Sequence, residues 1–185
     1  MAVINAIKRN PLPEEIKVKR IVSRDDHSRL VEYGRKWLNR PYKNAVRYGH
    51  GRCATILCEL VTIAGEIPDV IGWESNRSIL IEAKTSKADF FKDKEKPWRR
   101  VPELGMGDTR YFIADKGIIP VEKLPDKWGL LEVFNGRIEV TKDAEYIGGN
   151  KNHEIIMLLS HIRRISDTAK QDAERKSEEL ASNVV

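Results

Sequence analysis

Two acidic residues and a lysine stand at the ends of two short apolar runs in this 185-residue chain. Asp69 opens the first run, and Glu82-Ala83-Lys84 closes the second. Strand side chains alternate between faces, so Glu82 and Lys84 point the same way and Ala83 points the opposite way. If the runs pair as a hairpin through residues 74–77, Asp69 lies beside Glu82 and Lys84. Such a set suits one or two divalent cations and an activated water.

The bland alternative for Asp69 and Glu82 is a pair of solvated residues at strand ends. The run 79–81 is wholly apolar, however, as in a strand buried on both faces, and a carboxylate beside it is costly unless it is paired or bound to a metal. We therefore expect a metal site. Mg²⁺ is the natural ion because the ligands are hard oxygens, and Mn²⁺ could substitute for it. Lys84 could also simply pair with Glu82, which is compatible with a catalytic role.

A preceding segment offers a further acid. Residues 53–64 repeat apolar side chains at helical spacing and end at Gly65, which predicts a helix with Glu59 beside its apolar face. Glu66 is nearer to Asp69 in sequence and competes with Glu59 for the same role.

The predicted elements alternate in a way that is typical of an α/β domain with a mixed central β-sheet. Asn135-Gly136 is a strong signal for a tight hairpin turn. Asn39-Arg40-Pro41 predicts the end of the first helix, and Ser86 with Asp89 forms a capping pattern that opens another. We divide the chain into an N-terminal arm (1–24), an α/β domain (25–150) and a C-terminal helix with a charged tail (151–185). The predicted helices span about 23–40, 53–64, 86–95 and 152 onward, and the predicted strands span about 16–22, 67–72, 78–84, 110–114, 129–134 and 137–140.

The C-terminal helix carries an apolar stripe that we expect to face inward. The stripe fades beyond Asp167, and the tail lacks leucine heptads, so a coiled coil is not expected. The helix could dock on its own core or on a second copy, which leaves the oligomeric state open between a monomer and a homodimer. The stripe consists of Ile155, Ile156, Leu159, Ile162 and Ile165.

The net charge is +5, a modest excess that is compatible with nucleic acid as a partner. No apolar run approaches ~20 residues and the N-terminus lacks the order of a signal peptide, so we expect a cytoplasmic protein without a membrane partner. Trp98 could stack on a base or seal the core, and His50 could be a general acid or an incidental loop residue. The candidate nucleic-acid contacts are Arg52, Ser86, Lys87, Lys94, Lys96 and Trp98.

Asp69, Glu82 and Lys84 also carry a resemblance to a known family. They look like the signature of the PD-(D/E)xK nuclease superfamily, with Glu59 as a fourth member. The flanking residues 86–98 and 108–114 resemble its MmcB-like branch, which comprises bacterial proteins linked to DNA repair. The resemblance covers roughly residues 27 to 140.

The resemblance implies a three-layer, restriction-endonuclease-like core and a Mg²⁺-dependent deoxyribonuclease acting in DNA repair or in the processing of mobile-element or phage DNA. Asp69, Glu82 and Glu59 would hold the metal, with the Ala83 carbonyl as a further ligand. Lys84 would help position or activate the water that attacks phosphorus in line, and the 3′ oxygen would leave. A catalytically silent DNA-binding module of the same fold and a nuclease acting on RNA are the alternatives.

Overall fold

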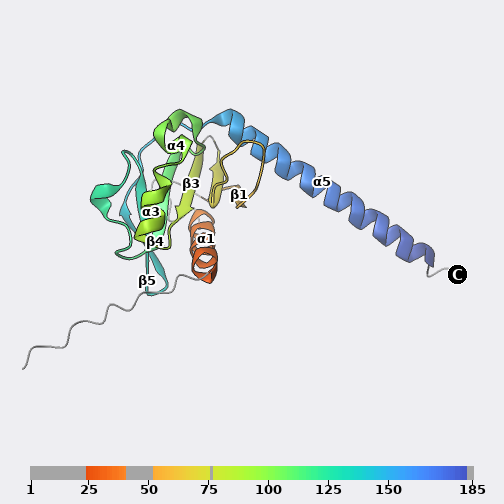
Figure 1. The fold of residues 1–185 in the computed structure, drawn as a ribbon. Coiled ribbons are helices and arrows are strands. Elements are labelled where there is room, and N and C mark those ends of the chain that lie inside the picture. Colours follow the sequence, from red (N-terminus) through yellow and green to blue (C-terminus); the bar gives the residue numbers. More distant parts are fainter. Residues whose placement is uncertain (1–23, 41–51, 76, 183–185) are drawn as a thin grey trace, which may run out of the picture.

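The computed structural model describes residues 24–40, 52–75 and 77–182 (Figure 1). Six strands form one sheet in the order β1-β2-β3-β4-β5-β6. β3 pairs with β4 and β4 with β5 in parallel, whereas the other neighbours are antiparallel. The predicted α/β architecture with a mixed central sheet is therefore confirmed. The strands are β1 (Thr55–Cys58), β2 (Val70–Glu74), β3 (Arg77–Ala83), β4 (Thr109–Asp115), β5 (Gly129–Phe134) and β6 (Arg137–Lys142).

The sheet has helices over both faces, which makes three layers. Side chains alternate along β3, so Ile79, Ile81 and Ala83 pack in the core beneath α1 (Arg24–Leu38), while Leu80 packs in the core on the other face. Phe90 of α3 (Lys87–Asp93) and Met157 of the C-terminal helix belong to that second core. A short helix α4 (Pro97–Arg100) and the 3₁₀ turns Pro102–Leu104 and Val121–Lys123 complete the described elements.

The hairpin of β2 and β3 is confirmed. Val70 pairs with Ile81, so the residue before β2, Asp69, lies opposite the end of β3. α1 crosses this hairpin closely, because a side chain at Gly34 would meet Val70 at 3.2 Å. The first turn of α1 is thereby brought over the same edge of the sheet.

The helix predicted over residues 53–64 is wrong. β1 occupies residues 55–58 and pairs with β2, and residues 59–69 connect the two strands without a helix. A short apolar run is ambiguous between helix and strand, and pairing at the edge of the sheet outweighed the helical spacing here. Glu59 therefore follows an edge strand instead of standing on a helix.

Several local predictions are confirmed. α1 ends at Leu38, as the Asn39-Arg40-Pro41 sequence predicts. Ser86 caps α3 by accepting a hydrogen bond from the Asp89 amide. Asn135 and Gly136 both have positive φ in the turn between β5 and β6. The strand predicted at 16–22 and the loop with His50 lie outside the described residues.

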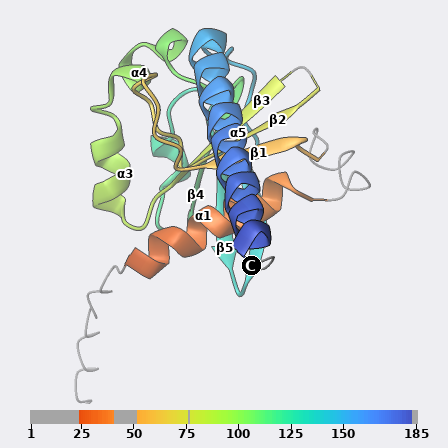
Figure 2. The ribbon, with the colours of Figure 1, turned by 90° about the vertical axis from the view of Figure 1, so that its right-hand side faces the viewer.

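The C-terminal helix α5 (Lys151–Ser182) runs away from the body of the molecule (Figures 1 and 2). The expectation that its apolar stripe faces inward is wrong, because Ile155, Leu159, Ile162 and Ile165 are exposed. Glu154 is buried instead and accepts hydrogen bonds from Trp73, Ser78 and Gly107, so another side of the helix is fixed against the body. In the part of the chain that the structure describes, none of the helices combines the length and apolar character needed to cross a bilayer.

Candidate functional site

The residues singled out in the sequence meet in one open cavity of about 540 Å³. It lies where the loop before β2, the end of β3 and the face of α3 come together. Asp69, Glu82 and Lys84 all line it, which is the arrangement that the hairpin predicts. The cavity is lined by His27, Asp69, Glu82, Ala83, Lys84, Asp89, Lys92, Asp93, Glu95 and Lys96.

Asp69 is fixed by the backbone of β3. Its Oδ2 accepts a hydrogen bond of 2.7 Å from the Ala83 amide, which leaves Oδ1 directed toward His27 at 3.6 Å. Burial, together with the charge of Glu82, raises the pKa of Asp69 from about 3.8 to about 7. A positive charge placed beside Asp69 would therefore favour its ionised form.

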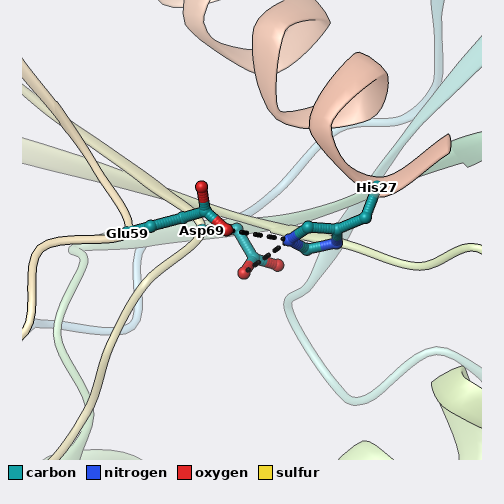
Figure 3. A group of neighbouring side chains, drawn as sticks. All are labelled: His27, Glu59 and Asp69. Carbon is teal, nitrogen blue, oxygen red and sulfur yellow. Dashed lines mark hydrogen bonds and ion pairs between the residues drawn. The ribbon is translucent and has the colours of Figure 1, made fainter. Parts of the chain in front are cut away.

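His27, Glu59 and Asp69 form a cluster whose ligand atoms lie within 4.8 Å of one another (Figure 3). The Nε2 atom of His27 is 3.2 Å from Glu59 Oε1. The cluster joins α1 to the two ends of the loop 59–69. One imidazole and two carboxylates are a ligand set that divalent transition metals accept.

Sequence reasoning missed His27, although a signal existed. His27 stands three and four residues before Leu30 and Val31, which are buried in the core beneath α1. Residues at this spacing share one face of a helix, so His27 must point toward the sheet. Arg29 of the same helix bonds Asp115 at the end of β4, and this contact holds the first turn in place.

Glu59 joins the cluster by a different route from the one predicted. It follows the edge strand β1 with a φ of 49°, and its amide lies 3.2 Å from the carbonyl oxygen of Asp69. Its side chain is 54% exposed. The competing acid, Glu66, is buried and turned away from the cavity, where it accepts hydrogen bonds from the Met106 amide and from Arg99.

Glu82 lies among three cations. Its Oε2 is 2.9 Å from Lys96 Nζ and 3.4 Å from Lys84 Nζ, and its Oε1 is 3.1 Å from Arg99 Nη2. The Arg99 contact lacks the alignment of a hydrogen bond, so Oε1 is a buried acceptor without a hydrogen-bond partner. Oε1 thus faces the Arg99 guanidinium, whereas Oε2 contacts Lys84 and Lys96, which line the cavity.

Asp93 completes a buried network of three acids and three bases. It accepts from Lys84 at 2.9 Å and contacts Lys96 and Arg99. Burial acts to raise the pKa of Asp93, but the charges of Arg99 and Lys84 outweigh it and lower the pKa to about 2. The members of the network are Glu66, Glu82, Asp93, Lys84, Lys96 and Arg99.

The charges of this network balance, whereas those of the neighbouring cluster do not. Asp69 and Glu59 face only the imidazole of His27 within ion-pair distance, among the ion pairs of the described residues. A divalent cation would neutralise both carboxylates, and Glu82 lines the same cavity. The residues present therefore fit a divalent metal.

The expected nucleic-acid contacts are placed unevenly. Lys96 lines the cavity, whereas Ser86 caps α3 and does not belong to the cavity lining. Lys87 and Lys94 are exposed, and Lys94 lies 5.4 Å over the ring of Phe91. Trp98 is half-buried, with an indole nitrogen that lacks a hydrogen-bond partner.

Arg52 is exposed before the start of β1, at the opposite end of that strand from Glu59, so the structure does not bring it to the cavity. Lys92 lines the cavity and was not singled out from the sequence.

Comparison with known proteins adds little to this description. No family model and no curated protein matches the chain. A solved structure, the SPO1766 protein of unknown function from Silicibacter pomeroyi, is similar with a TM-score of 0.48 and 24% sequence identity. The similarity covers 64% of this chain and 81% of that chain.

Proposed function

We propose that this protein is a metal-dependent nuclease of the PD-(D/E)xK superfamily that hydrolyses phosphodiester bonds in DNA. The observation that carries the proposal is the convergence of Asp69, Glu82 and Lys84 on one open cavity. The His27–Glu59–Asp69 cluster beside them supplies an unbalanced negative charge. Carboxylates, an imidazole and a poised ammonium are the parts that metal-assisted phosphodiester hydrolysis needs.

Each residue has a role that follows from its position. Asp69 and Glu82 would hold the metal from neighbouring strand ends, and His27 and Glu59 would complete the set from the other side. The Ala83 carbonyl, between Glu82 and Lys84 in the chain, remains the further ligand that we expect. When bound, a divalent cation would polarise the phosphate and lower the pKa of water.

Lys84 would stabilise the negative charge that develops on the phosphate. Its ammonium lies 2.9 Å from Asp93 and 3.4 Å from Glu82, so its position is fixed by both carboxylates. A donor that is already in place costs no reorganisation when charge develops, which is how preorganised sites lower a barrier. Lys96 and Lys92 line the same cavity and would contact flanking phosphates.

The imidazole also bears on the choice of metal. Carboxylate oxygens suit Mg²⁺ and Mn²⁺ alike, whereas a nitrogen ligand favours transition metals over Mg²⁺. We therefore propose that Mg²⁺ supports activity and that Mn²⁺ does so at a lower concentration.

One observation favours a second candidate, a catalytically silent DNA-binding module. Glu82 is already surrounded by Lys84, Lys96 and Arg99, and these cations compete with a metal for its carboxylate. Lys96 would have to turn outward for Glu82 Oε2 to bind a metal. This candidate predicts salt-sensitive DNA binding without turnover in either metal.

A cleavage assay with matched variants distinguishes the two candidates. The substrates are single-stranded, duplex, nicked and branched DNA, with RNA alongside, each in Mg²⁺, in Mn²⁺ and in EDTA. We expect metal-dependent cleavage of DNA that Lys84→Ala lowers by about 10²-fold or more. Lys84→Met keeps the side-chain volume, and circular dichroism verifies that both variants fold.

Lys170→Ala is the control, because it removes the same charge from an exposed position on α5. It should cleave like the wild type. Equal cleavage by wild type and folded Lys84→Ala would refute the catalytic role, and binding without cleavage in every metal would establish the silent module. Faster cleavage of RNA than of DNA would redefine the substrate.

A further inference from the structure

The exposed face of α5 is an apolar feature of the described surface that the proposed nuclease site does not use. Four aliphatic side chains on this face are between 52% and 57% exposed. Contiguous exposed apolar surface of this kind marks an interaction site more often than solvated surface. The four are Ile155, Leu159, Ile162 and Ile165.

Three of these residues, Ile155, Leu159 and Ile162, lie on one stripe that faces away from the body, and Ile165 lies at the side of this stripe. At 100° per residue, Ile155, Leu159 and Ile162 fall within about 60° of one another around the helix axis. Glu154 and Met157, on other sides of the helix, are buried against the body, and Arg164 on the opposite side donates to the Val61 carbonyl at 2.7 Å. The stripe therefore points to solvent while the helix is held from behind.

We propose that α5 pairs with the α5 of a second copy of this chain, in antiparallel orientation, through this stripe. The stripe continues toward the C-terminus with the exposed small residues Ser166, Ala169 and Ala173. When two such helices run antiparallel with their centres near residue 164, Ile155 meets the partner's Ala173. Leu159 then meets the partner's Ala169, so large side chains face small ones along the seam.

The charges of α5 are also complementary in this orientation. Residues 151–166 carry three basic and one acidic side chain, whereas residues 167–182 carry three basic and five acidic ones. Antiparallel pairing lays each positive half on a negative half, and parallel pairing would place like on like. The same register brings Arg163 beside the partner's Asp167, twice in the two-fold pair.

The length of the helix suits a pair held by this element alone. Its 32 residues span about 48 Å, and most of that length stands clear of the sheet (Figure 1). The two bodies then sit at opposite ends of the paired helices. Each nuclease cavity stays open, because the stripe faces away from the loop that carries Glu59 and Asp69.

Oligomeric state measured by sedimentation velocity tests the pairing. We expect the full-length protein to be a dimer at micromolar concentration, and Ile162→Glu to weaken the dimer by at least about tenfold. Gln171→Glu is the matched control, since it adds the same charge to an exposed position on the far side of α5. A monomeric wild type, or equal dimerisation of Ile162→Glu and the control, would overturn the proposal.

Disulfide trapping tests the orientation. In a Cys58→Ser background, Ile165→Cys lies near the two-fold axis and should cross-link to itself, whereas Ile155→Cys should not. Strong cross-linking through position 155 would mean a parallel pair and would overturn the proposal. Arg163→Asp should weaken the dimer, and adding Asp167→Arg should restore it, with circular dichroism to verify that the helix content of both variants is unchanged.

Discussion

Asp69 is held by two opposing influences. The Ala83 amide donates a short hydrogen bond to it, which favours the ionised form, but burial and the charge of Glu82 disfavour ionisation more strongly and raise its pKa to about 7. An ionised carboxylate at this position therefore lowers the free energy of unfolding. A cation that binds there would raise it again, which is the behaviour expected of a metal ligand.

Asp69→Asn should abolish metal-dependent cleavage and at the same time stabilise the metal-free protein. The amide keeps an oxygen that can accept from Ala83 and removes the repulsion with Glu82. We expect a gain on the order of 2 kcal/mol in the free energy of unfolding at pH 8. Urea denaturation in EDTA measures it.

The pH dependence gives the sign of this effect. The folded-state pKa of Asp69 is raised above its usual 3.8, so its contribution to stability is complete below pH 4 and is lost as pH rises through about 7. The advantage of Asp69→Asn should thus grow between pH 5 and pH 8. A variant less stable than the wild type at pH 8 would contradict this account.

His27 provides a second residue-level prediction. Its Nε2 lies 3.2 Å from Glu59 and 3.6 Å from Asp69, and we therefore include it among the proposed metal ligands. His27→Ala should weaken Mn²⁺ binding by about 10–100-fold, with a smaller loss for Mg²⁺. Isothermal titration in both metals checks this, with His161→Ala on α5 as the control. Equal affinities in the two variants would remove His27 from the site.

At the scale of elements, the segment from α3 to α4 is tied to the sheet by charge. Arg99 has a side chain only 4% exposed, and it pairs with Glu66, Glu82 and Asp93. Burial acts to lower its pKa, but these carboxylates raise it, so the guanidinium is always charged. One arginine thus connects α4 to the loop before β2, to β3 and to α3.

Arg99→Ala should therefore destabilise the protein far more than Arg100→Ala, the same substitution at the next residue. Removing one member of a buried ionic network leaves the others uncompensated, and we expect a loss of roughly 3–5 kcal/mol. Arg100→Ala, at an exposed position, should cost about 0.5 kcal/mol or less. Urea denaturation of both proteins makes the comparison. A difference below about 1 kcal/mol would mean that the network does not hold the segment.

The sequence was most informative where local signals agree with tertiary pairing. The hairpin of β2 and β3, the capped helix α3 and the Asn135-Gly136 turn could all be predicted, because alternation, capping and turn chemistry act over a few residues. Residues 55–58 could not, because a four-residue apolar run fits either a helix or an edge strand, and pairing with β2 decided the outcome.

The site shows the same division. Asp69, Glu82 and Lys84 follow from strand register, whereas His27 reaches them from an element 42 residues earlier than Asp69 through the packing of α1 on the sheet. The α5 stripe has the periodicity of a buried helix face. The stripe is nevertheless exposed, because the hydrogen bonds of Glu154 hold another side of the helix against the body. A periodic pattern predicts that a face is covered but not by which molecule.

At the scale of the whole molecule, the proposed nuclease site and the proposed pairing surface of α5 are spatially separate. The cavity opens where the ends of β3, α1 and α3 meet. α5 extends away from the body on another side (Figure 1). In the proposed dimer both cavities would stay open to one nucleic acid, a partner with which the net charge of +5 is compatible.

The most direct test of the account is Mn²⁺ binding followed by the electron paramagnetic resonance signal of the free ion. The wild type should bind Mn²⁺ specifically, and Asp69→Asn should lose that binding while it remains folded. The control Lys170→Ala should bind as the wild type does. If Asp69→Asn removed as much free Mn²⁺ as the wild type, Asp69 would not be a metal ligand and the case for a metal-dependent nuclease would fail.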